Sequence, residues 1–338
     1  MREAVKRQIT AKRAGLVIVF IAGLFAGWML RFLLPEELPA MKKLEKHTGQ
    51  FLFINPLLEC ESGEQYLSRG LKLFKGRVVE LVDKKISEGK AEKIAVYFRD
   101  LNNGPFFQIN RDEYFFPGSL LKIPILMGYL RQAEFNPLIF EKKIRFDGAS
   151  FGVVQHIRPP EELMPGGSYS VRELLYRMIA YSDNYSARML VESDAFDLRI
   201  KIYSDLGIAL PEENAGMFTM NIKDDASFFR VLFNASYLSK DMSNSALELM
   251  SQSAFRDGLV KGVPANVTVS HKFGERDDGN VKQFHDCGII YYPNYPYLLC
   301  VMTKGKDFDD LISVIEDVSK LTYEEVDSQM RLNPEPGK

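Results

Sequence analysis

Three short strings could do chemistry together, because they supply a hydroxyl nucleophile, a base and a positive charge. Ser119-Leu120-Leu121-Lys122 places a serine hydroxyl and a lysine amine three positions apart, on one face of a helix. A serine becomes nucleophilic when a nearby base takes its proton, and a buried lysine with a lowered pKa can be that base. Ser182-Asp183-Asn184 and Lys272-Phe273-Gly274 follow later in the chain. Together they are candidates for a serine acyl-transfer site.

Each string also has a purely structural interpretation. A serine at a helix start is most often an N-cap, and Ser-Asp-Asn between two helices is a common turn. Ser-x-x-Lys also occurs at Ser87–Lys90, which shows how easily the pattern arises. The functional interpretation is favoured by the order of the strings and their separation, 63 residues (119 to 182) and then 90 residues (182 to 272).

In this order the strings resemble the serine–lysine, SDN and KTG motifs of class A β-lactamases and penicillin-binding proteins. The resemblance implies an acyl-enzyme formed on Ser119, with Lys122 as the base and Ser182 as a proton relay to the leaving nitrogen. It implies that Asn184 bonds to the substrate amide and to the catalytic lysine, and that Asp183 fixes the loop.

The third string carries the substrate-facing roles that the resemblance implies. Lys272 supplies positive potential for a substrate carboxylate, and Gly274 lets the substrate approach the backbone. The backbone N–H of Glu275 pairs with that of Ser119 as an oxyanion hole. Phe273 departs from the family, which has Thr or Ser at this position to bind the carboxylate. We expect its ring to point into the cleft, where it either narrows the cleft or suits a less polar substrate.

A second departure concerns deacylation. Class A β-lactamases carry a glutamate in an E-x-x-L-N loop that activates the deacylating water. Glu212 and Glu213 are the candidates here, but neither is followed by Leu-Asn at the right offsets. Two solvated acids are an equally good interpretation. Without that base an acyl-enzyme would persist, which is typical of penicillin-binding proteins.

The elements that must position these strings follow from periodicity and turn signals. Apolar residues at helical spacing predict a helix over 64–88, and Asn-Gly between two apolar runs predicts a hairpin of strands 94–101 and 106–110. The middle, from about 117 to 262, is predicted to be mostly helical. Three strands (267–273, 284–292 and 297–303) and a helix over 308–321 close the chain.

The predicted fold class is α/β, with a five-stranded antiparallel sheet flanked by the terminal helices and an all-helical lobe. The β-lactamase/D,D-peptidase fold is similar to this arrangement. The resemblance covers residues 64–322, the serine hydrolase domain, with the site where the two lobes meet. We expect residues 323–338 to be a flexible tail.

The N-terminal residues predict one transmembrane helix. Residues 14–30 carry no charge, and the apolar run reaches residue 34 if Arg31 snorkels, which suits a bilayer crossing. A basic segment, 1–13, precedes this anchor and a juxtamembrane linker, 35–63, follows it. The positive-inside rule puts the N-terminus in the cytoplasm and the catalytic domain outside the cell membrane. The alternative is a cleaved signal peptide, which the long run disfavours.

Composition excludes several classes of protein. The formal net charge of −2 argues against nucleic acid as a partner, since no basic excess exists to neutralise phosphates. No His or Cys pair has metal-ligand spacing, so we expect neither a metal nor another cofactor. Cys287 and Cys300 fall on neighbouring predicted strands, where a bridge is conceivable, but two small apolar strand residues are the favoured interpretation.

The sequence therefore predicts a membrane-anchored bacterial serine hydrolase of class A β-lactamase type, acting through acyl-Ser119. Its partners would be β-lactams or peptidoglycan peptides with acyl-D-Ala-type amides. The alternatives are a penicillin-binding D,D-peptidase with slow deacylation and a non-catalytic cell-wall-binding relative. The sequence does not fix the oligomeric state.

Overall fold

The computed structural model describes residues 51–55, 69–102, 104–149, 155–210, 212–214 and 217–332, all within one compact unit. None of the helices in these ranges is both long and apolar enough to span a membrane. The predicted anchor at 14–34 lies outside the described residues, as does most of the predicted linker.

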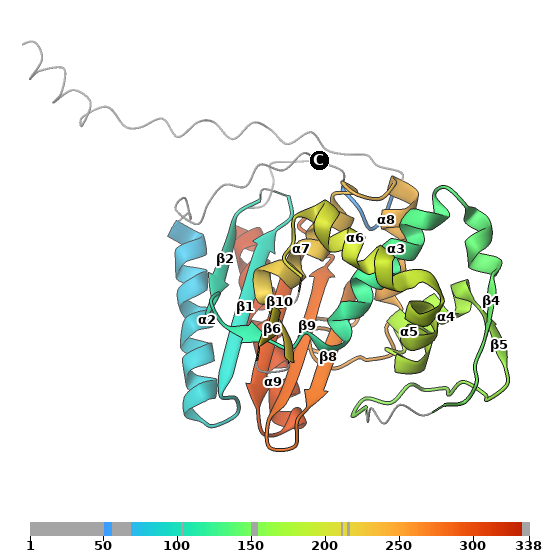
Figure 1. Ribbon diagram of the computed structural model, residues 1–338. Coiled ribbons are helices and arrows are strands. Elements are labelled where there is room, and N and C mark those ends of the chain that lie inside the picture. The colour runs from blue at the N-terminus through green and yellow to red at the C-terminus, as the bar shows by residue number, and fades with distance from the viewer. Residues whose placement is uncertain are drawn as a thin grey trace, which may run out of the picture. The chain divides into compact units, whose positions relative to one another are not determined.

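A five-stranded antiparallel sheet forms the centre of the fold, as predicted (Figure 1). Its strand order is β2-β1-β10-β9-β8. The pairing of β1 with β10 joins the two ends of the domain, with Lys93 opposite Lys304. Asn294 adopts a left-handed φ of 63° in the turn between β9 and β10. The strands are β1 (Lys93–Asp100), β2 (Phe106–Ile109), β8 (Val269–Asp277), β9 (Lys282–Ile290) and β10 (Tyr297–Gly305).

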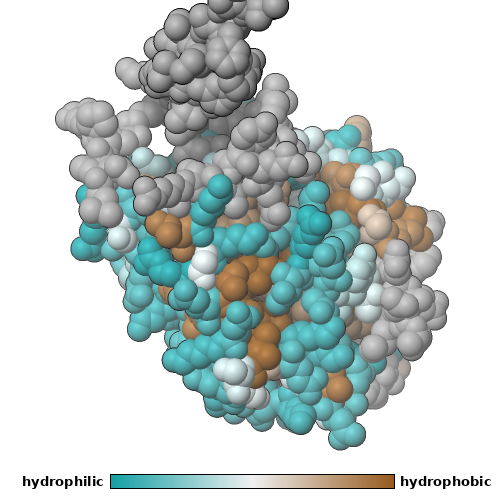
Figure 2. All heavy atoms as spheres, turned by 90° about the vertical axis from the view of Figure 1, so that its left-hand side faces the viewer, coloured by the Kyte–Doolittle hydropathy of each residue, from teal (hydrophilic) through white to brown (hydrophobic). Residues whose placement is uncertain are grey.

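The helices α2 (Arg69–Ser87) and α9 (Phe308–Leu332) cover one face of this sheet (Figure 1). Apolar residues at helical spacing, such as Phe74 and Val78 of α2, pack on every second residue of the strands. Figure 2 looks onto the side where α2 lies and shows a mostly hydrophilic surface interrupted by small apolar patches. This layer supports the back of the sheet.

The second lobe packs on the other face of the sheet, where α7 contacts β1, β9 and β10. It is not entirely helical as predicted, because short strands pair within it as β3-β7-β6 and β4-β5. The strands are β3 (Tyr114–Phe115), β4 (Lys143–Arg145), β5 (Ser168–Ser170), β6 (Glu212–Asn214) and β7 (Met217–Asn221). The helices are α3 (Lys122–Ala133), α4 (Val171–Ala180), α5 (Asn184–Leu190), α6 (Phe196–Leu206), α7 (Ile222–Phe233) and α8 (Lys240–Ser251).

The C-terminal segment corrects part of the predicted flexible tail, because α9 continues to Leu332 and residues 323–332 are helical. Residues 333–338 of that prediction lie outside the described residues. The extra turns remain amphipathic, and Val326 is buried in the core between α2 and α9. The exposed guanidinium of Arg77 reaches the buried Glu325 carboxylate at 2.6 Å. The Tyr292 hydroxyl donates to Asp327 at 3.0 Å. These contacts bind the last turns to the domain.

Residues 51–55 correct the predicted linker of 35–63. Phe53 and Ile54 are buried in the core of the helical lobe. The Phe53 N–H donates to Asn244, and Asn55 N–H donates to the carbonyl of Phe233. The segment is therefore part of the domain, because its apolar side chains fit against α7 and α8.

The structure also joins Cys287 and Cys300 by a disulfide, where the sequence favoured two unpaired apolar residues. The two cysteines lie directly opposite each other on β9 and β10, with their Cα atoms 4.0 Å apart. Register, rather than spacing along the chain, brings the sulfur atoms together.

Candidate active site

Ser119 lies in a 3-10 turn, η2 (Gly118–Leu121), that leads into α3. Gly118 has a left-handed φ of 58°, and a Cβ on it would lie 2.8 Å from the backbone N of Glu275. A Cβ on Gly274 would lie 2.3 Å from the Pro117 carbonyl oxygen and 3.2 Å from the Ser119 nitrogen. The turn and β8 therefore meet backbone to backbone, which places the amides of Ser119 and Glu275 side by side.

Lys122 begins α3 and lies one turn beyond Ser119, with its side chain buried. Its Nζ donates to Asn184 Oδ1 at 2.6 Å, to the Ser182 carbonyl, and to Ser182 Oγ at 3.3 Å. Burial lowers the pKa of Lys122 to about 7, although the charges of Asp183 and Glu275 act to raise it. The neutral amine, which can accept a proton, is therefore accessible to Lys122 near neutral pH.

The SDN string connects α4 and α5, as its composition predicts. Ser182 has a left-handed φ of 56°, a conformation that a non-glycine residue adopts at a cost of about 1–3 kcal/mol. Asp183 caps α5 by accepting hydrogen bonds from the N–H groups of Tyr185 at 3.0 Å and Ser186 at 3.2 Å. The predicted structural role of Asp183 is confirmed, and the cap holds Ser182 and Asn184 towards Lys122.

Lys272, on β8 of the sheet, reaches Ser182 from the lobe opposite that of Lys122. Its Nζ donates to Ser182 Oγ at 2.8 Å and to the Phe273 carbonyl at 2.9 Å. The side chain is almost wholly buried, and this burial, with the nearby charge of Lys122, holds its pKa well below the usual range. The Ser182 hydroxyl is thus shared by two lysines, an arrangement that can pass protons between groups on either side.

Phe273 does not narrow the cleft, and this expectation was wrong. Its ring is 1% exposed, lies 4.6 Å from the ring of Phe255 and stacks on Phe284 with an interplanar angle of 8°. Alternation along β8 turns this side chain towards the apolar layer beneath α9. The Lys272 Nζ lies 4.1 Å from the centroid of the Phe273 ring, within cation–π range.

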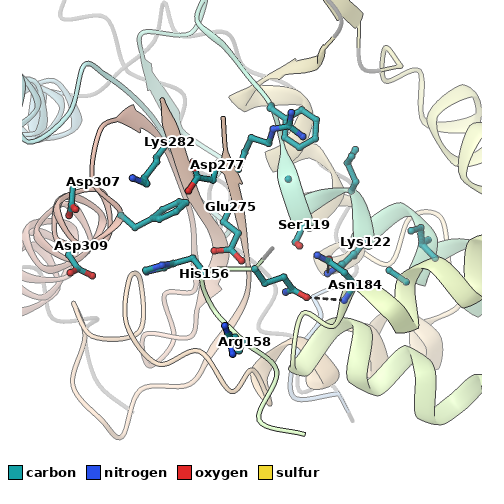
Figure 3. A pocket seen from close by; sticks show the side chains of 18 residues that line it. Ser119, Lys122, His156, Arg158, Asn184, Glu275, Asp277, Lys282, Asp307 and Asp309 are labelled. Carbon is teal, nitrogen blue, oxygen red and sulfur yellow. Dashed lines mark hydrogen bonds between the residues drawn. The ribbon is translucent and has the colours of Figure 1, made fainter. Parts of the chain in front are cut away.

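A cleft of about 1100 Å³ runs from Ser119 and Lys122 to the N-terminal end of α9 (Figure 3). Ser119, Lys122, Asn184 and Glu275 line it together, as predicted, and Gly118 adjoins them. Ser182, Lys272 and Phe273 lie behind this lining as buried side chains. The structure therefore gathers all three strings at one end of a single cavity.

Gln155 also joins this cluster, although no motif in the sequence points to it. Its Nε2 donates to the Ser182 carbonyl at 3.1 Å, and its Oε1 accepts from the Asn184 N–H at 3.3 Å. Two residues on, the Ile157 N–H donates to the Glu275 carboxylate at 3.2 Å. The segment carrying them therefore bonds to both lobes, and no motif marks it because its partners are distant in sequence.

Glu212 and Glu213 lie in β6, where they pair with Thr219 and Phe218 of β7. The structure describes the backbone at these positions and not the side chains. Their role as a deacylation base stays a prediction.

Comparison with known proteins agrees with this geometry. The model of the β-lactamase enzyme family matches residues 78–326. The chain is 22% identical over 259 residues to β-lactamase VEB-1 from Pseudomonas aeruginosa, covering 70% of this chain and 87% of that protein. A PBP-A mutant, solved as an acyl-enzyme complex with penicillin G, superposes with a TM-score of 0.63 at 21% identity, covering 76% and 97% of the two chains. A β-lactamase from Chitinophaga pinensis superposes with a TM-score of 0.65 at 18% identity, covering 74% and 99%.

The structural neighbours share the fold at low identity, whereas the family model spans most of the domain and includes all three strings. The chain therefore belongs to the β-lactamase enzyme family and is a class A β-lactamase-like serine hydrolase.

Proposed function

We propose that this enzyme opens β-lactams, or related acyl-D-Ala-type amides of cell-wall peptides, through an ester on Ser119. The observation that carries the proposal is the convergence of Lys122 and Lys272 on the Ser182 hydroxyl, in the cleft where Ser119 lies. A buried lysine with a pKa of about 7 beside a serine at a turn is suited to general-base activation.

The contacts suggest a balanced sequence of proton transfers. Neutral Lys122 takes the Ser119 proton as Oγ bonds to the substrate carbonyl carbon, and the amides of Ser119 and Glu275 stabilise the oxyanion. When the C–N bond breaks, Ser182 gives its proton to the leaving nitrogen and recovers one from Lys122, whose Nζ lies 3.3 Å away. In this scheme Asn184 orients Lys122, and Lys272 holds Ser182. Water then cleaves the ester and restores Ser119.

The sequence leaves two alternative functions for this chain. A penicillin-binding D,D-peptidase would form the same ester but release it slowly, and the absence of an E-x-x-L-N string in the sequence favours this candidate. A non-catalytic cell-wall-binding relative would keep the cleft without forming the ester. The intact set of Ser119, Lys122 and Ser182 argues against it.

We also propose that residues 14–34 anchor the enzyme in the cell membrane, with the domain on the extracytoplasmic side. The uncharged run and the basic residues before it support this topology. The Cys287–Cys300 disulfide supports it too, because disulfides persist mainly in oxidising compartments.

The proposal is tested by mixing the purified full-length chain with penicillin G and following protein mass and opened drug in the same samples. We expect an adduct of one drug per chain that is absent in Ser119→Ala. Ser87→Ala is the matched control, because Ser87 begins the other Ser-x-x-Lys string on exposed helical surface. Turnover of many equivalents identifies a β-lactamase, and a persistent adduct identifies the peptidase type. No adduct and no turnover would contradict the proposal.

A further inference from the structure

The proposed reaction uses the backbone amide of Glu275 but gives no role to its side chain. Its side chain leaves β8 directly after Gly274 and lines the cleft with Ser119 and Lys122. Figure 3 shows the carboxylate between Ser119 on one side and Asp307 and Asp309 on the other. Both carboxylate oxygens lie within 3.3 Å of the Ile157 N–H, so this contact orients the side chain towards the cavity.

The groups that would bind a substrate carboxylate at this end of β8 are altered. The hydroxyl that the family carries is replaced by Phe273, whose ring lies in the core. The Lys272 amine is buried, donates to Ser182 and to the Phe273 carbonyl, and lies against the Phe273 ring. The amine of Lys272 is therefore already hydrogen-bonded to protein groups and does not line the cleft.

Besides Lys122, the cations that line the cleft are Arg158, Arg276 and Lys282. Arg276 is paired with Asp278 at 2.6 Å and lies over the Phe116 ring, and Lys282 donates to the Lys306 carbonyl. Arg158 and His156 lie on the segment that faces Glu275. The acids that line this end of the cleft are Glu275, Asp277, Asp307 and Asp309.

The surroundings of the Glu275 carboxyl determine its protonation state. Burial raises the pKa of Glu275 to about 7, while the Ile157 N–H and the charges of Lys122 and Lys272 act to lower it. Above that pH the group is an anion and a hydrogen-bond acceptor only.

From this geometry we infer that Glu275 is the specificity-determining residue of the cleft. It disfavours substrates with a carboxylate beside the scissile amide, and it favours substrates with a neutral carboxamide or an ammonium group there. The inference rests on the proposed function, since it concerns the substrate that acylates Ser119. A substrate carboxylate is repelled by the like charge of Glu275. A substrate carboxamide or ammonium group is attracted, because its N–H can donate a hydrogen bond to the Glu275 carboxylate.

The test compares two probes that share one acyl group, penicillin G and its primary carboxamide, at about pH 8.5, where Glu275 is ionised. The second-order rate constant for acylation is measured for each with the full-length chain. We expect the wild-type chain to prefer the carboxamide by roughly tenfold or more. Glu275→Gln keeps an acceptor for the Ile157 N–H and removes the charge, so the preference should shrink by roughly fivefold or more.

Glu141→Gln is the matched control, because it removes the same charge from an exposed carboxylate paired with Arg172 outside the cleft. The Glu141→Gln variant should prefer the carboxamide over penicillin G by the same factor as the wild type. Equal rates with the two probes, a preference for penicillin G, or a preference unchanged in Glu275→Gln would overturn the inference and leave the proposed function standing. Failure of both probes to label Ser119 would overturn the inference and the proposed function together.

Discussion

At the scale of single residues, the site depends on two buried lysines that share one hydroxyl. Lys122 and Lys272 both donate to Ser182 Oγ, at 3.3 Å and 2.8 Å. A positive charge on one lysine raises the free energy of a positive charge on the other. Burial and this repulsion therefore favour the neutral form of the Lys272 amine. The left-handed backbone of Ser182 is the local cost of bringing its hydroxyl between them.

This arrangement predicts how acylation depends on pH. Because the pKa of Lys122 is lowered to about 7, the rate should rise with pH below about 7 and level off above it. The negative charge of Glu275 raises the pKa of Lys122, so Glu275→Gln should move the rise to lower pH. The charged groups acting on Lys122 are Asp183 and Glu275, with Lys272 close by.

The profile is measured from about pH 5.5 to about pH 8.5 with the neutral carboxamide probe, so that substrate ionisation does not contribute. A flat profile would contradict the assignment of Lys122 as the base. A rise that shifts to higher pH in Glu275→Gln would contradict the sign of the coupling.

At the scale of elements, the close contact between η2 and β8 brings together the two amides of the proposed oxyanion hole. Gly274→Ala should therefore reduce acylation by roughly a hundredfold or more, because its Cβ would push the turn away from the strand. The measurement is the acylation rate, with thermal unfolding to show that the domain remains folded. Wild-type acylation in a folded Gly274→Ala chain would refute the arrangement.

Gly76→Ala is the control, because a Cβ there meets nothing within 4 Å in the middle of α2. It should leave acylation unchanged and raise stability by about 0.5–1 kcal/mol, since alanine costs less entropy than glycine in a helix.

Sequence reasoning found the elements whose signals are local. The β-branched and aromatic runs of β8, β9 and β10 predict strands, and Ser-Asp-Asn predicts the turn between α4 and α5. It did not predict side-chain positions that depend on contacts with residues distant in the chain. The Phe273 ring faces the apolar layer because Phe255 and Phe284 pack against it there, and neither contact can be predicted from the sequence around Phe273. Gln155 bonds to residues 27 and 29 positions away, which no spacing rule predicts.

At the scale of the whole molecule, the last turns of α9 close the core beside α2. Val326 is 8% exposed there, whereas Ser328 of the same helix faces solvent. Val326→Asp should destabilise the domain by about 3 kcal/mol or more, because it buries an unpaired charge, whereas Ser328→Asp should change stability by about 0.5 kcal/mol or less. Denaturant unfolding of the two variants measures the difference. Equal stabilities would mean that residues beyond 322 do not contribute to the fold.

The position of β8 at the end of the strand order has a further consequence. Within the described sheet β8 pairs with β9 alone, so its other edge carries backbone donors and acceptors at strand spacing. An extended acyl chain lying there would act as a temporary sixth strand, and a shift of one residue would turn its side chains to the opposite faces. The register of that sixth strand would then decide which bond of the substrate lies next to Ser119.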